Sequence, residues 1–232
     1  MKSITLSALC ASILVAASGA AQASLVDRGG GLIYDTALNV TWLQDANYAR
    51  TSGYDADGFM SWDAATAWAG QLVYGGYDDW RLPGVAPANG VSFNYAATYN
   101  GSTDAGYNIT RPSSELAYNF YVNLGNQGSN TTTGAPTSCN AGSCFTNTGL
   151  FTNLVAGYGS WYGQEFWGYG YAGYGWVFDS HGYQSGNFKT VNYYAWAVRP
   201  GDVAVVPVPG AIWLLGSGLL GLLSFKRRSN IG

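Results

Sequence analysis

Short runs of strand-forming residues at both ends of the chain predict β-structure. Residues 32–34 and 40–43 are two such runs, and the polar stretch 35–39 between them has the composition of a turn, so we expect a β-hairpin. Further along, aromatic and β-branched residues predict three more strands, at 161–167, 175–180 and 193–199.

A helical period predicts one helix over 61–72. Trp62, Ala65, Ala69 and Leu72 share one face of this segment, and Ser61 is suited to cap its N-terminus.

A second helix is expected to begin near 112–116. Leu116, Phe120 and Leu124 then align on one face, and Gly125 is suited to end the helix. The predicted fold class is therefore α+β, with two helices against one twisted, mostly antiparallel sheet. The stretch 125–149 is rich in Asn, Thr, Gly and Ser, and we expect a long exposed loop held only by a disulfide.

The N-terminus has the pattern of a secretory signal. Lys2 precedes the apolar stretch 4–17, and small residues flank Gln22. We expect residues 1–23 to be a signal peptide cleaved between Ala23 and Ser24; the alternative is a buried N-terminal helix.

The C-terminus has the pattern of a membrane anchor. Residues 208–225 are 18 residues without a charge. As a helix at about 1.5 Å per residue they reach about 27 Å, close to the roughly 30 Å of a bilayer core. The cations Lys226, Arg227 and Arg228 follow directly and predict a cytoplasmic end, with the preceding domain outside. A buried C-terminal helix is the alternative.

The sequence of this tail resembles the PEP-CTERM sorting signals of Gram-negative bacteria. The residues that carry the resemblance are Pro207, Pro209, Trp213, Arg227 and Arg228. It implies that residues 207–232 are recognised by an exosortase, a membrane protease-transpeptidase. The implied localisation is export, inner-membrane anchoring through the C-terminal helix, and then the cell surface or extracellular matrix.

The net charge of residues 24–206 limits the kinds of molecule that this domain can bind. Residues 24–206 keep six Lys and Arg against thirteen Asp and Glu, a net charge of −7. This acidity excludes a nucleic-acid partner and disfavours anionic polymers unless a divalent cation bridges them. Aromatic residues are 16% of the chain, enough to build a core despite the low charge content of 10%.

The exported chain keeps two cysteines, because Cys10 lies in the signal. Cys139 and Cys144 are an even pair in an oxidising compartment, and we expect a disulfide. Its small ring contributes about 2 kcal/mol in the chain-entropy model. A metal site is the alternative, but it needs more ligands than these two and the distant His181.

The middle of the chain resembles the Lcl C-terminal domain family of bacterial surface proteins. The resemblance rests on 31–35 with 42–43, 62–72, 79–83, 114–116, 176–178 and 197–201. It implies one domain over 24–206 with a fold similar to C-type-lectin-like and formylglycine-generating-enzyme-like domains, in which the first and last strands meet. It also implies structural roles for Arg81 and Arg199, which would satisfy carbonyls or carboxylates beside Trp residues; a ligand role is the alternative. The segment 84–112 is an insertion relative to the family.

Signals for catalysis are sparse. The acid pair Asp78 and Asp79 sits in a fold motif, the spacing of Asp55 and Asp57 hints at calcium without the other oxygen ligands, and His181 has no evident nucleophile beside it. We therefore expect no catalytic residue, no cofactor and no metal. The cysteine-based chemistry of the formylglycine-generating relatives is not carried over, because Cys139 and Cys144 lie five positions apart in a polar loop and fit a structural disulfide better. Calcium-dependent sugar binding is not carried over either, because its motifs are missing.

Aromatic residues among glycines are the remaining candidates for binding. Tyr169, Tyr171 and Tyr174 either pack on one another or stack against sugar rings. The sequence thus favours an exported, non-enzymatic surface or matrix protein, with polysaccharide or another extracellular ligand as its expected binding partner. The alternatives are a secreted enzyme of unknown reaction and a purely structural matrix component.

Overall fold

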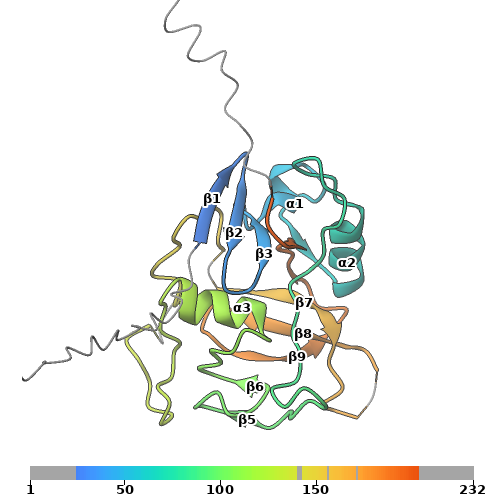
Figure 1. Ribbon diagram of the computed structural model, residues 1–232. Coiled ribbons are helices and arrows are strands. Elements are labelled where there is room, and N and C mark those ends of the chain that lie inside the picture. The colour runs from blue at the N-terminus through green and yellow to red at the C-terminus, as the bar shows by residue number, and fades with distance from the viewer. Residues whose placement is uncertain (1–24, 140–142, 156, 171, 204–232) are drawn as a thin grey trace, which may run out of the picture.

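The computed structural model describes residues 25–139, 143–155, 157–170 and 172–203. Their fold is mixed α+β, as predicted, but the strands form two sheets instead of one (Figure 1). The helical elements are α1 (Tyr48–Thr51), α2 (Trp62–Gln71), α3 (Glu115–Tyr118) and a π-helical turn, η1 (Asn119–Asn123).

The smaller sheet has the order β1-β2-β3-β11 and is antiparallel throughout. Its strands are β1 (Leu25–Gly29), β2 (Leu32–Asp35), β3 (Val40–Leu43) and β11 (Val198–Pro200). The predicted hairpin is β2–β3, and Asp35 closes its turn by accepting hydrogen bonds from the backbone of Ala37 and Leu38 at 3.0 Å each. The pairing of β3 with β11 brings the two ends of the described chain into one sheet.

The larger sheet has the order β4-β10-β7-β8-β9-β6-β5. Its strands are β4 (Phe59–Met60), β5 (Ala97–Thr98), β6 (Ala105–Gly106), β7 (Gly159–Glu165), β8 (Tyr174–Asp179), β9 (Gln184–Phe188) and β10 (Tyr193–Tyr194). The β10–β7 and β5–β6 pairs are parallel, and the others are antiparallel.

The strand predicted over 193–199 is wrong as a single element. Its first residues form β10 in the larger sheet and its last form β11 in the smaller one. Between them the fully buried Ala195 and Ala197 carry the chain from one sheet to the other. Trp196 packs there against Trp42 at 4.6 Å between ring centroids, and its indole N–H donates to the Leu43 carbonyl oxygen at 2.8 Å. Core packing therefore overrides the strand propensity of this segment.

Both predicted helices are confirmed, and the second is irregular. The Ser61 hydroxyl caps α2 by accepting the Ala64 N–H at 3.4 Å, and Trp68 is buried on the core side of this helix. Leu116 and Phe120 are buried as the period predicts, but the helix widens into η1 after α3.

The loop over 125–149 is wrong as an exposed excursion held only by its disulfide. Asn126 is buried, and its side-chain oxygen accepts the backbone N–H groups of Thr146 and Asn147 at 3.1 and 2.8 Å. The backbone of Ser129 donates to the His181 carbonyl at 2.8 Å. Polar side chains thus hold this segment together with the buried Cys144 and the partly buried Phe145, whose ring lies 5.1 Å from that of Phe120.

Two segments that each contain a tryptophan and an arginine, 79–83 and 196–201, meet across the fold and are called the two tryptophan–arginine motifs below. The backbones of Arg81 and Val198 exchange hydrogen bonds of 2.8 and 2.9 Å. Arg199 pairs with Asp79 at 2.7 Å, and Arg81 pairs with Glu115 at the start of α3 at 2.8 Å. Both arginines satisfy carboxylates, which confirms their expected structural role.

Candidate functional site

The predicted stacking tyrosines separate in the structure. Tyr174 is buried, with its ring 4.3 Å from Phe188 and 4.7 Å from Tyr169 between centroids, so the packing alternative holds for it. Tyr169 is 54% exposed and keeps a ring face available. Tyr171 lies outside the described residues.

A longer aromatic surface lies beside Tyr169. The rings of Tyr99 and Tyr107 are within 11° of parallel at 5.7 Å, and Tyr107 lies 4.8 Å from Tyr183. Burial raises the pKa of Tyr183, and the nearby hydroxyls of Tyr107 and Tyr169 raise it further. These four residues, Tyr99, Tyr107, Tyr183 and Tyr169, are called the aromatic strip below.

Three adjacent strands position the strip. Tyr99 follows β5, Tyr107 follows β6 and Tyr183 precedes β9, and these strands are neighbours at one edge of the larger sheet (Figure 1). Gly106 makes the close approach of β5 to β6 feasible, because its φ is +113° and a Cβ there would lie 2.0 Å from the Thr98 carbonyl oxygen.

Segment 84–112 carries Tyr99 and Tyr107 and is held in place by an ion pair and hydrogen bonds. The buried carboxylate of Asp104 pairs with Arg111 at 2.8 Å and accepts the backbone N–H groups of Ala88 and Asn94, each at 2.8 Å. The buried Gln184 side chain donates to the Asp104 carbonyl at 2.8 Å and so ties this segment to β9. Sequence reasoning missed Tyr99, Tyr107 and Tyr183, because no local period groups residues from three separate strands.

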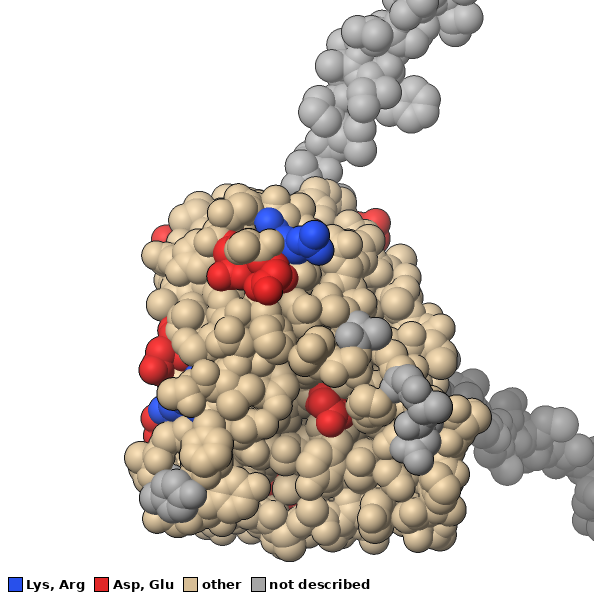
Figure 2. Space-filling model, turned by 180° about the vertical axis from the view of Figure 1, so that it is seen from behind, with Lys and Arg blue, Asp and Glu red and all other residues tan. Residues whose placement is uncertain are grey.

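Charged side chains are few and mostly engaged with one another. Among the described residues, five of the six cations form ion pairs: Arg28–Asp202, Arg81–Glu115, Arg111–Asp104, Lys189–Glu165 and Arg199–Asp79. Figure 2 shows a face with large uncharged areas between small blue and red groups. The surface therefore suits uncharged ligands better than polyanions.

In the loop after α1, the carboxylates of Asp55 and Asp57 accept hydrogen bonds from backbone N–H groups of residues 57–59. Asp55 accepts the backbone N–H groups of Asp57 and Gly58 at 3.1 and 2.8 Å, and Asp57 accepts that of Phe59 at 3.0 Å. Within the described ranges no three His, Cys, Asp or Glu side chains gather in a group that could hold a metal ion.

Two of the three residues considered as catalytic candidates, Asp79 and His181, make contacts that support the fold. Asp79 is paired with Arg199, and His181 lies in the turn between β8 and β9, where its backbone N–H donates to Asp179 at 2.9 Å. Asp78 is exposed beside Asp79.

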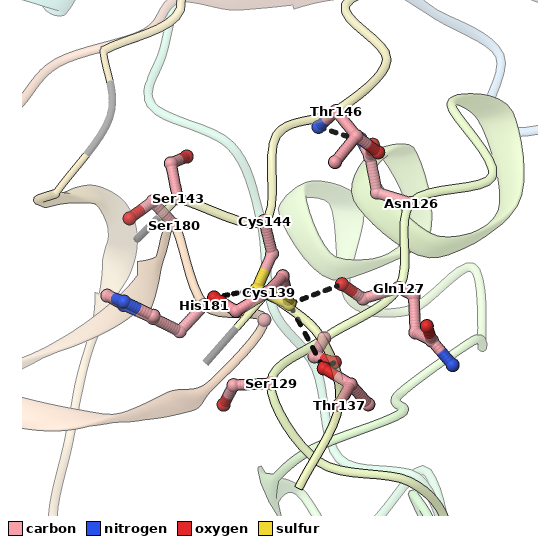
Figure 3. Close-up of a disulfide and its surroundings, with 12 residues drawn as sticks. Asn126, Gln127, Ser129, Thr137, Cys139, Ser143, Cys144, Thr146, Ser180 and His181 are labelled. Carbon is pink, nitrogen blue, oxygen red and sulfur yellow. Dashed lines mark hydrogen bonds between the residues drawn. A yellow bond between two sulfur atoms is a disulfide. The ribbon is translucent and has the colours of Figure 1, made fainter. Parts of the chain in front are cut away.

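The predicted disulfide is present (Figure 3). The sulfur atoms of Cys139 and Cys144 are 2.06 Å apart, and Cys144 is fully buried. The backbone N–H of Cys144 donates to the Ser180 carbonyl at 2.9 Å, which seats the ring against the β8–β9 turn. The disulfide thus closes a small ring within the 125–149 segment, and the Cys144 backbone hydrogen bond attaches that ring to the larger sheet.

The predicted signal peptide, residues 1–23, and the sorting tail, residues 207–232, lie outside the described residues, as do the cleavage positions Ala23 and Ser24. In the part of the chain that is described, no helix has the length and apolar character needed to cross a bilayer.

Comparisons with protein-family models, with curated proteins and with solved structures each gave no match to this chain.

Proposed function

We propose that this protein is exported, acts without catalysis at the cell surface or in the extracellular matrix, and binds a neutral polysaccharide on the aromatic strip. The observation that carries the proposal is the series of neighbouring rings Tyr99, Tyr107 and Tyr183, of which Tyr99 is 49% exposed. Tyr169, 54% exposed, lies within electrostatic range of Tyr183. Sugar rings stack on such faces through their C–H groups, and adjacent rings can follow successive sugars along a chain.

A C-type-lectin-like domain of the Lcl C-terminal type is the fold proposed for residues 24–206. Its support is that the first and last strands share one sheet, in which β3 pairs with β11, and that Arg28 on β1 pairs with Asp202 at 2.5 Å. The contact between the two tryptophan–arginine motifs agrees with the same proposal.

The orientation of the strip also supports a surface role. β1 and β11 lie towards the opposite end of the molecule from β5 and β6 (Figure 1). The described chain ends at Val203, shortly after β11, and the proposed anchor follows it. A domain held at the membrane through that end would direct the strip outward, towards extracellular polymers.

Affinity electrophoresis through a neutral glucan, hydroxyethylcellulose, tests the binding. The full-length exported protein in mild detergent should be retarded equally at low and physiological salt, because stacking involves little charge to screen. Replacing both Tyr99 and Tyr107 with Ala should remove the retardation. Tyr54→Ala is the matched control, because Tyr54 is 48% exposed and lies outside the strip.

Retardation that persists in the double variant, or that collapses with salt, would overturn the assignment of the strip. A protein that binds no glycan on a wide array of neutral polysaccharides would favour the structural-matrix alternative instead.

Sorting of the tail is a separate part of the proposal. Cells with a matching exosortase should release a species lacking about 26 C-terminal residues, and changing Pro207 and Pro209 to Ala should leave the tail attached. Mass spectrometry of the exported protein distinguishes the two forms. Peptides beyond Trp213 on the exported protein in such cells would show that the tail is an anchor without a sorting role.

A further inference from the structure

Arg50 differs from every other cation in the described part of the chain. The other five are held in ion pairs, whereas Arg50 is exposed and has no ion pair or side-chain hydrogen bond there. Among the described cations, Arg50 is therefore the one whose guanidinium is free to pair with a carboxylate from outside the chain.

Arg50 lines an open hollow of about 470 Å³. The side chains around it are Asn47, Arg50, Thr51, Asn153, Leu154 and Val155. This volume falls within the roughly 300–1,000 Å³ of small-molecule sites. The lining offers one cation, the exposed polar side chains of Thr51 and Asn153, and two apolar residues, whereas the Asn47 amide is buried and donates to the Asp57 carbonyl at 3.1 Å.

Two segments distant in sequence form the hollow. One side is α1, and the other is the stretch 152–155. The backbone N–H of Ala46 donates to the Thr152 carbonyl at 3.0 Å, and the N–H of Thr152 donates to the Gln44 carbonyl at 2.9 Å. Asn153 turns the chain with a φ of +56°, a conformation that asparagine tolerates better than most residues. The wall is therefore fixed by main-chain bonds.

Exposed aromatic surface adjoins the hollow. Tyr158 is 54% exposed, and it shares with Asn153, Leu154 and Val155 the lining of a narrow neighbouring cavity of about 20 Å³. Its ring lies 4.8 Å from that of Phe59. An aromatic ring face thus stands beside a cation and uncharged hydrogen-bonding groups.

Arg50 also interacts electrostatically with Tyr194, which lines the same narrow cavity as Tyr158. Burial and the Asp57 carboxylate raise the pKa of Tyr194, which also lines the narrow cavity, and Arg50 opposes that rise. The guanidinium and the Tyr194 hydroxyl therefore lie within electrostatic range of one another.

We infer that Arg50 and this hollow form a second binding site, which takes a carboxylate-bearing sugar such as a single uronate residue. The planar guanidinium can hold a carboxylate with two parallel hydrogen bonds. Thr51 and Asn153 supply partners for sugar hydroxyls, and Tyr158, in the lining of the neighbouring cavity, supplies a face for the ring. One cation in a domain of net charge −7 selects one carboxylate and does not suit a densely charged polymer.

This site is independent of the aromatic strip, and its test uses a different probe. Glucuronate is titrated into the full-length exported protein in detergent and followed by NMR chemical shifts, with glucose as the neutral match. We expect glucuronate to bind on the order of ten-fold or more tighter than glucose, as a charged hydrogen-bonded pair implies.

Substitutions then locate the site. Arg50→Gln should abolish the preference for glucuronate, and Arg50→Lys should keep only part of it, because an ammonium lacks the planar fork. Arg28→Gln is the matched control, since Arg28 is already paired with Asp202. The double Tyr99→Ala, Tyr107→Ala variant should bind glucuronate as before, which separates this site from the strip.

Three results would overturn the inference: a glucuronate preference that survives Arg50→Gln, equal affinity for inorganic phosphate, or tighter binding of an acetylated dipeptide carboxylate than of glucuronate. The second would indicate a general anion site, and the third a peptide site.

Discussion

The two ends of the molecule both hold charged side chains in ion pairs, but they differ in the exposure of their aromatic side chains. Around the smaller sheet, Arg81 and Arg199 are paired with carboxylates and Trp42 is fully buried. Around β5 and β6, Tyr99 is half exposed and ion pairs lie beneath the surface, as with Asp104 and Arg111. The residues that are easiest to recognise in the sequence therefore stabilise the fold. Segment 84–112, which contains Tyr99, supplies exposed aromatic surface.

Trp42→Ala should give the largest effect and shows how far the motif end carries stability. Trp42 is fully buried against Trp196 and Phe151, so its loss should cost about 3–5 kcal/mol of unfolding free energy. Trp167→Ala is the control, because Trp167 is 48% exposed and should change stability by about 0.5 kcal/mol or less. Urea denaturation compares the two variants. Equal losses of unfolding free energy would show that the burial of Trp42 does not account for its contribution to stability.

Gly106→Ala tests whether the close approach of β5 and β6 is required for stability and for glucan binding. A Cβ at this φ of +113° would overlap the Thr98 carbonyl, so we expect a loss of up to about 3 kcal/mol together with weaker glucan retardation. Gly90→Ala in the same segment, 84–112, is the control, since Gly90 has φ +70° with nothing within 4 Å. A Gly106 variant that binds normally would show that the spacing of β5 and β6 does not matter to the strip.

Removing the disulfide should have an intermediate effect. Changing Cys139 and Cys144 to Ser should cost about 2 kcal/mol while leaving the fold intact, because Asn126 still holds the 125–149 segment. Reduced wild-type protein should match the double variant in thermal unfolding. Collapse of the fold, or free thiols in non-reduced exported material, would contradict this assignment.

Asp79→Asn should give the smallest effect, and one that depends on pH. Hydrogen bonding to Arg199 lowers the pKa of Asp79 in the folded state, so its contribution is present above the unfolded-state pKa of about 3.9 and disappears as pH falls through the lower folded value. The stability gap between wild type and variant should therefore narrow in acid. Asp78→Asn is the control, with no ion pair at Asp78 among the described residues; a gap of constant size would point to lost packing instead.

Local signals account for the elements that were predicted correctly. The β2–β3 hairpin has a turn closed by the adjacent Asp35, and α2 has its cap at Ser61 and its buried face at a 3.6-residue period. Both depend on residues a few positions apart, so their physics is visible in the sequence.

Non-local contacts account for the errors. β5 and β6 are two residues long, and their pairing exists because Gly106 and Thr98 can approach closely. The break at 195–197 depends on Trp196 reaching Trp42, more than a hundred residues away. No pattern within either segment reports such partners.

The sequence by itself determined the charge, the pairing of Cys139 with Cys144, the hairpin and α2, because each follows from composition or from neighbours along the chain. Only the tertiary structure decided that there are two sheets, that Tyr174 is buried while Tyr99 is exposed, and that Arg50 lacks an acid. The physical reason is that exposure and ion pairing depend on what folds against a side chain, and those neighbours come from distant parts of the chain.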